Sequence, residues 1–169
     1  MDEGKRRNLL MADWARTNLT IVADSETLMK IVNQLGYRDP DAKNHLETEQ
    51  VVFSLWNILR PPTDSLGEYY APSKSVNGAE HDSPYNWFRW NLENWGTKWD
   101  CGNPQRQEIL EENMVVYDFD TAWDFPANAL MHLSYQYPEA SITAVATYSD
   151  GGATIASWKD GEQIGITEF

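Results

Sequence analysis

Apolar side chains in this 169-residue chain recur with the period of a strand, then of a helix, then of a strand again. Residues 17–22 alternate polar and apolar side chains, which is typical of a half-buried strand. Residues 25–35 place apolar side chains three and four positions apart, which predicts an amphipathic helix. Residues 51–59 are apolar enough for a second strand, and Pro61 and Pro62 end it. This part of the chain therefore predicts a strand–helix–strand unit.

The helix predicted at residues 25–35 carries signals at both ends. Asp24 or Ser25 can cap its first turn, because a short side chain there accepts a hydrogen bond from a backbone N–H. Gly36 lies where the backbone commonly turns left-handed, a conformation that glycine adopts without steric cost. We therefore expect a capped helix that ends at a left-handed Gly36.

The same order recurs in the C-terminal part of the chain. Residues 114–120 carry β-branched and aromatic side chains on both faces, which favours an interior strand. Residues 126–137 predict a helix, and residues 141–148 predict the next strand. A tight-turn signal then returns the chain as residues 153–158, and residues 164–167 can add an edge strand.

Two strand–helix–strand units on one sheet are most economically arranged as an α+β ferredoxin-like βαβ–βαβ sandwich. The aromatic-rich residues at about 60–112 would form an insertion between the halves, and the last strands would form a C-terminal hairpin. We expect a flexible N-terminus at residues 1–12 and a single α+β domain at residues 13–169, because this length supports one core.

The insertion holds the most unusual feature of the sequence, a cluster of Trp residues. Residues 84–94 and 103–112 predict short helices around it. Aromatic rings beside a cation can stack on a ligand, and they can equally form a satellite core where the insertion meets the sheet. We expect Trp95, Trp99 and Trp123 to pack together. The candidate residues of a ligand pocket are Trp95, Lys98, Trp99, Asp100 and Trp123.

Acidic residues outnumber basic ones, 26 against 13, which gives a formal net charge of -13. Residues 111–169 contain ten acidic side chains and one basic side chain, Lys159. This asymmetry is typical either of a solvated acidic face or of a surface that binds a basic partner. The candidate partner-binding residues are Asp118, Asp120, Asp124, Glu139, Asp150, Asp160 and Glu162.

The sequence lacks the motifs of the common catalytic and cofactor sites. It has no phosphate-binding loop, no dinucleotide fingerprint and no nucleophile elbow. The single cysteine, Cys101, excludes an internal disulfide and a cysteine-cluster metal site, although nearby Lys98 could lower its pKa. Asp118, Asp120 and Asp124 have part of the spacing of a calcium loop but lack its glycine and final glutamate. We expect Asp124 to cap the next helix, and we expect no metal and no cofactor.

Three segments together resemble a known family. They are residues 14–22, the Asn-Trp-Gly-Thr-Lys-Trp-Asp stretch at 94–100, and the Phe-Asp-Thr-Ala-Trp-Asp-Phe-Pro stretch at 119–126, whose helix runs to Tyr137 and Pro138. This combination is similar to the YubB-like proteins of plasmids and bacteriophages. The resemblance implies a C-terminal ferredoxin-like domain and an origin in a mobile element. It implies no catalytic residue.

These observations favour a small acidic protein that binds and inhibits or modulates a host protein with a basic surface. Such a protein would present carboxylates where nucleic-acid phosphates would otherwise lie, and its target could be a nucleic-acid-directed defence factor. The alternatives are a single-stranded nucleic-acid-binding module that uses the Trp cluster, and a metal-dependent enzyme that uses Asp118 and Asp120. The charge argues against direct nucleic-acid binding. We expect a non-enzymatic protein in the cytoplasm of the bacterial host, with no membrane segment, and a homodimer is compatible with the predicted sheet.

Overall fold

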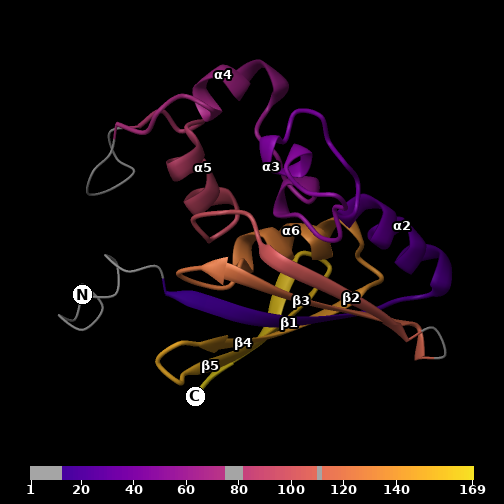
Figure 1. The fold of residues 1–169 in the computed structure, drawn as a ribbon. Coiled ribbons are helices and arrows are strands. Elements are labelled where there is room, and N and C mark those ends of the chain that lie inside the picture. Colours follow the sequence, from indigo (N-terminus) through magenta and orange to yellow (C-terminus); the bar gives the residue numbers. More distant parts are fainter. Residues whose placement is uncertain (1–12, 75–81, 110–111) are drawn as a thin grey trace.

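The computed structural model describes residues 13–74, 82–109 and 112–169, and within them the chain forms a mixed α+β fold around one antiparallel sheet (Figure 1). The expected flexible N-terminus at residues 1–12 lies outside the described residues. The six strands have the spatial order β2-β3-β1-β4-β5-β6. They are β1 (Trp14–Val22), β2 (Gly102–Ile109), β3 (Met114–Ala122), β4 (Ser141–Tyr148), β5 (Ala153–Lys159) and β6 (Glu162–Glu168).

Figure 1 shows the helices together on one face of this sheet. The five α-helices of the described residues are α2 (Ser25–Leu35), α3 (Lys43–Leu46), α4 (Leu66–Tyr69), α5 (Trp87–Asn94) and α6 (Ala127–Gln136), with 3₁₀ turns η1 (Leu55–Asn57) and η2 (Thr63–Ser65). None of the described helices has the length and apolar character needed to cross a bilayer.

Strands β1 and β3 bury alternate residues, as a sheet with one covered face requires. Leu19, Tyr117 and Phe119 point into the core between sheet and helices, where each is fully buried. Arg16 and Asp120 alternate with them and so lie on the opposite, open face, where they pair across β1 and β3. The core therefore sits between the sheet and the helical layer, and the other sheet face is polar.

The structure confirms most of the predicted elements. The helix at 25–35 is α2, and Asp24 caps it, because its Oδ1 accepts a hydrogen bond from the Thr27 N–H at 2.9 Å. The strand predicted at 114–120 is β3, which is interior because it pairs with both β1 and β2. The predicted elements at 17–22, 84–94, 126–137, 141–148, 153–158 and 164–167 correspond to β1, α5, α6, β4, β5 and β6.

Two predictions around the insertion are wrong. Residues 51–59 form no strand; they run irregularly through η1, and buried side chains such as Phe53 and Leu55 enter the core beneath the helical layer. The strand that follows α2 in the sheet is instead β2, in the segment where a helix was predicted at 103–112. An edge strand keeps its register through backbone pairing to one neighbour, so a polar sequence suffices. We call residues 36–101, between α2 and β2, the insertion; in their described part they contribute no strand to the sheet.

Gly36 also differs from its prediction, since its φ is -96° and therefore not left-handed. Its lack of a side chain serves close packing instead. A Cβ at this position would lie 3.1 Å from the Val51 carbonyl oxygen and 3.3 Å from the Val32 carbonyl oxygen. Both neighbours are backbone atoms, so the chain at the end of α2 can lie this close to the Val51 backbone only with glycine at position 36.

We therefore expect Gly36→Ala to destabilise the fold by about 1–3 kcal/mol, the usual cost of overpacking. Gly67→Ala is the matched control, because no atom lies within 4 Å of a Cβ at Gly67 and alanine favours the helix. Urea unfolding of both variants measures the difference. Equal stability of the two variants would contradict the close-packing role of Gly36.

Candidate ligand-binding site

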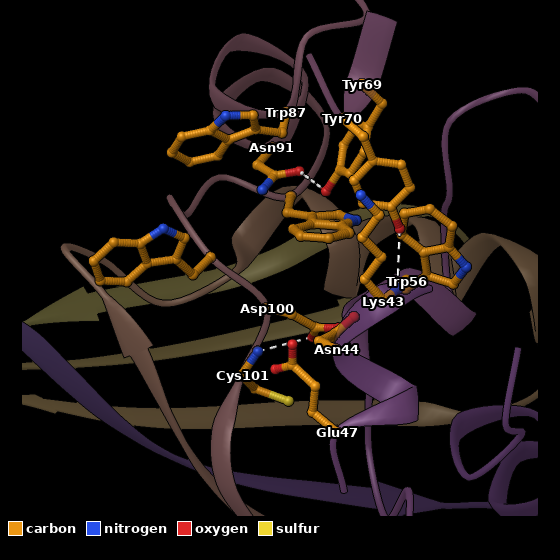
Figure 2. Close-up of a pocket in the computed structure, with 12 residues that line it drawn as sticks. Lys43, Asn44, Glu47, Trp56, Tyr69, Tyr70, Trp87, Asn91, Asp100 and Cys101 are labelled. Carbon is orange, nitrogen blue, oxygen red and sulfur yellow. Dashed lines mark hydrogen bonds between the residues drawn. The ribbon is translucent and has the colours of Figure 1, made fainter. Parts of the chain in front are cut away.

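A cavity of about 480 Å³ lies between α3, α5 and the segment that leads into β2 (Figure 2). We call it the aromatic pocket. This volume is within the range of small-ligand sites. Its lining residues are Lys43, Asn44, Glu47, Trp56, Tyr69, Tyr70, Trp87, Asn91, Trp95, Trp99, Asp100 and Cys101.

The aromatic wall of the pocket is built from rings that pack on one another. The rings of Trp56 and Tyr69 meet edge to face at 5.4 Å, and those of Tyr69 and Tyr70 do so at 5.0 Å. The Tyr69 hydroxyl donates a hydrogen bond to Asn91 Oδ1 at 2.8 Å, and burial raises the pKa of Tyr69 above its usual value. These contacts hold the wall rigid and uncharged.

Carboxylates occupy the side of the pocket that Figure 2 shows near Cys101. Asp100 Oδ1 accepts the backbone N–H groups of Leu55 at 2.7 Å and Cys101 at 2.8 Å. Its Oδ2 accepts the Asn44 amide at 3.0 Å and the Ser54 hydroxyl. In the described part of the chain, neither Asp100 nor the exposed Glu47 forms an ion pair.

A buried histidine, His45, is linked to the Asp100 carboxylate through Ser54. His45 Nδ1 accepts the Asp39 backbone N–H at 3.0 Å, so the neutral ring carries its hydrogen on Nε2. Nε2 lies 2.7 Å from Ser54 Oγ, and Ser54 in turn donates to Asp100. The serine proton therefore points to the aspartate and not to the histidine, so this chain of bonds is not a nucleophile–base arrangement.

Burial lowers the pKa of His45, although the negative charges of Asp100 and Asp39 act in the opposite direction. Below about pH 6.5 the unfolded chain takes up a proton that folded His45 resists. We therefore expect stability to fall as the pH decreases from about 6.5 toward the lower folded pKa, by at most about 1.4 kcal/mol per pH unit from this group.

Urea unfolding between about pH 5 and pH 7 measures this slope for the native chain and for His45→Gln. The variant should lose the His45 contribution to the slope, whereas the control His132→Gln on α6 should retain it. An unchanged slope in His45→Gln would rule out His45 as its source.

Lys98 lies in a second aromatic group, next to the pocket. Its ammonium is 4.5 Å from the ring centroid of Trp99, 4.9 Å from that of Trp123 and 6.0 Å from that of Phe88. The Trp99 ring also lies 6.1 Å from Trp14. We call Lys98 and these three rings, Trp99, Trp123 and Phe88, the lysine cage; it ties α5 to the ends of β1 and β3.

This geometry separates the predicted pocket residues into two sets. Trp95, Trp99 and Asp100 line the aromatic pocket, whereas Lys98 and Trp123 belong to the lysine cage, which shares Trp99 with the pocket. The expectation that Trp95 packs with Trp99 and Trp123 is wrong. Trp95 instead meets Trp90 edge to face at 5.5 Å and donates its indole N–H to the Leu59 carbonyl at 2.8 Å.

We expect Lys98→Met to destabilise the protein by about 1 kcal/mol, because it keeps the side-chain length and removes the charge that the rings face. Lys30→Met is the control, since Lys30 forms only an exposed ion pair with Glu26 at 3.3 Å. Thermal unfolding of both variants gives the comparison. A Lys98→Met protein as stable as the control would show that the cage is held by ring packing alone.

Cys101 differs from its prediction. Burial raises the pKa of its thiol, and Asp100 raises it further. The thiol donates to the Phe53 carbonyl at 3.1 Å, and the ammonium of Lys98 is held in the lysine cage. The suggestion that Lys98 lowers the pKa of Cys101 is therefore wrong.

The candidate acidic residues lie in three places. Asp118 and Asp120 lie on the open sheet face, where Asp118 accepts a hydrogen bond from Asn18 at 3.2 Å and Asp120 pairs with Arg16 at 3.2 Å. In residues 13–74, 82–109 and 112–169, no group of three His, Cys, Asp or Glu side chains could hold a metal.

The other five acidic candidates lie at opposite ends of the sheet. Asp124 accepts a hydrogen bond from the Tyr148 hydroxyl at 2.9 Å. Tyr148 ends β4, and Asp150 follows two positions later in the β4–β5 turn. At the other end, Lys159 donates to the Glu139 carbonyl at 2.7 Å, beside Asp160 and Glu162 in the β5–β6 turn. Asp124 does not cap α6, whose N-cap is Pro126 without a side-chain bond.

Three of the twelve residues that line the aromatic pocket were predicted from the sequence. Trp56 lies in the segment where a strand was predicted, and Tyr69 and Tyr70 lie in the predicted insertion at about 60–112. Two adjacent tyrosines within a segment rich in Pro, Ser and Gly are the signal that could have identified that wall, since large rings in a solvated loop need a surface to pack on. Nothing in the sequence pointed to Lys43 or Glu47.

Comparison with solved structures finds a similar fold in the crystal structure of protein api92 from Yersinia pseudotuberculosis, whose family model is DUF1281. The TM-score is 0.59 at 11% sequence identity, and the match covers 94% of this chain and 98% of that chain. At this identity the likeness concerns the fold alone. No family model and no curated protein sequence matches this chain.

Proposed function

We propose that this chain is a non-catalytic binding protein that takes a basic side chain of a partner protein into the aromatic pocket. The observation that carries this proposal is the convergence of six aromatic rings with two carboxylates, Glu47 and Asp100, that have no ion-pair partner in the described residues. Aromatic faces attract cations electrostatically, and a nearby unpaired negative charge strengthens that preference.

Two cations of the chain itself already lie against rings of this wall. The Lys43 ammonium is 4.2 Å from the Tyr70 ring centroid, and the Arg60 guanidinium is 5.0 Å from that of Trp56. Arg60 is held there by Asp39 at 2.6 Å. A cation supplied by a partner would find the same ring chemistry at the other aromatic residues of the pocket, Trp87, Trp95 and Trp99.

The charge of the whole chain supports a basic partner. A net charge of -13 attracts a basic protein from a distance and repels nucleic-acid phosphates. Because the seven acidic candidates lie in three places, we assign them this long-range attraction, and we assign the specific contact to the pocket. The YubB-like motifs support a plasmid or bacteriophage origin, so we propose a host protein as the partner, such as a nucleic-acid-directed defence factor that the chain inhibits or modulates.

We also propose that the fold is a ferredoxin-like sandwich with additions. The element order β1-α2-β2-β3-α6-β4 and the sheet order β2-β3-β1-β4 support this assignment. Residues 36–101 would then be an insertion between α2 and β2, and β5 and β6 would extend the sheet beyond β4.

The proposal is tested with a pair of small probes, N-acetyl-arginine methylamide and its citrulline analogue, which have the same shape but differ in charge. We expect the arginine compound to shift the indole NMR signals of Trp87 and Trp99 and to bind about tenfold more tightly, since a desolvated cation–π contact contributes about 1–2 kcal/mol.

Glu47→Gln should weaken binding of the arginine probe, because it removes a pocket carboxylate. Glu49→Gln is the matched control, since Glu49 is exposed nearby but does not line the pocket. Equal affinity for arginine and citrulline would contradict the proposal. An oligothymidine that shifts the pocket signals when arginine does not would favour the single-stranded nucleic-acid hypothesis.

A further inference from the structure

The two edges of the sheet differ in how they are protected against strand pairing. Edge strand β2 contains Pro104, charged residues at 106 and 108, and an irregularity between Gly102 and Gln105. Natural edge strands commonly use such features to prevent pairing with another chain. Edge strand β6 has no proline and no basic residue, and all seven of its residues are exposed. Its two charged residues stand at its ends, and its pairing with β5 is regular from Gly165 to Glu168, beyond an irregularity between Ser157 and Trp158.

Strand β6 offers backbone groups as well as an open edge. The Phe169 N–H and carbonyl both bond to Ala153, and bonded and non-bonded pairs alternate along an antiparallel ladder. Thr167 therefore bonds to Ile155, whereas the N–H and carbonyl groups of Ile166 and Glu168 point away from β5. These groups are available to an additional strand.

Apolar side chains accompany this edge. Ile164 and Ile166 are 66% and 51% exposed, which is unusual for two isoleucines in one strand of a folded protein. Tyr135 of α6, 72% exposed, packs beside the β5–β6 turn, where a Cβ on Gly161 would lie 3.1 Å from its ring. An added strand with apolar residues could cover these side chains.

The charges at the ends of β6 identify the kind of strand that fits. Glu162 and Glu168 stand at its two ends, and Asp160 precedes it, whereas the neighbouring Lys159 already binds the Glu139 carbonyl. In the antiparallel register that pairs β6 with a second copy over its full length, Glu162 would lie opposite Glu168 of that copy. Like charges directly opposite each other destabilise a strand pair, so a strand with basic ends fits better than a second copy.

We propose that β6 is a strand-addition site for an extended segment of a partner protein that has apolar residues at alternate positions and Lys or Arg at its ends. The inference does not depend on the aromatic pocket, because the pocket lies against the insertion and β6 lies at the edge formed by the last strand. Backbone hydrogen bonds would supply the attraction, and the two glutamates would set the register.

The probe is the peptide acetyl-Lys-Thr-Val-Thr-Val-Thr-Lys-amide, added to the full chain. We expect slower hydrogen exchange at the amides of Ile166 and Glu168, and little change at Thr167, whose N–H is already bonded to β5. A peptide with Glu in place of both Lys should bind about tenfold more weakly, a difference of about 1.4 kcal/mol. A peptide N-methylated at alternate positions should not slow exchange, because it lacks the donors.

Ile166→Pro removes an outward N–H and should abolish protection by the peptide, while an edge strand tolerates the proline. Ile166→Lys tests the same position without a backbone change, and Ile155→Lys on β5 is the matched control for charge. Loss of binding in both Ile166 variants with retention in Ile155→Lys supports the proposal. Binding that survives either Ile166 variant overturns it, and so does concentration-dependent protection of Ile166 without peptide, which would identify a second copy as the occupant.

Discussion

The Asp100 carboxylate fixes the insertion to the sheet. It stands just before β2 and accepts hydrogen bonds from the backbone of Leu55 and Cys101 and from the side chains of Asn44 and Ser54. The Leu55 N–H lies in a fully buried residue, and leaving it without a partner would cost about 1–3 kcal/mol. These bonds hold Asn44, Ser54 and Leu55 beside the segment that leads into β2, on the side of the aromatic pocket that Asp100 lines.

The two most recognisable sequence motifs meet in the fold. The Thr97 hydroxyl donates to the Ala122 carbonyl at 2.5 Å, and the Ala129 N–H donates to the Trp95 carbonyl at 3.3 Å. Gly96 between them has a φ of +85°, a left-handed conformation that glycine adopts most easily. These contacts account for the motif at 94–100 and the motif at 119–126 as one packing unit between α5, β3 and α6.

An element could be predicted from the sequence where its own side-chain pattern stabilises it, and could not where other parts of the chain do so. The α2 helix and strands β1 and β3 were predictable, because their apolar periodicity is the pattern by which they bury one face. Strand β2 was not, since the partner that orders it is the backbone of β3. Residues 51–59 gave a false strand because their apolar side chains are buried without pairing. Pocket residues such as Tyr69 and Lys43 come together only through the path of the insertion, which local pattern does not reveal.

The aromatic pocket is made of side chains that are spread over residues 43–101 and are adjacent only when the insertion is closed on the sheet. Local unfolding of any part of that layer separates some of these side chains, so the pocket is present only while the layer is folded. A ligand bound in the pocket therefore stabilises the whole folded layer. At a hundred times its Kd, it would add about 2.7 kcal/mol to the free energy of unfolding.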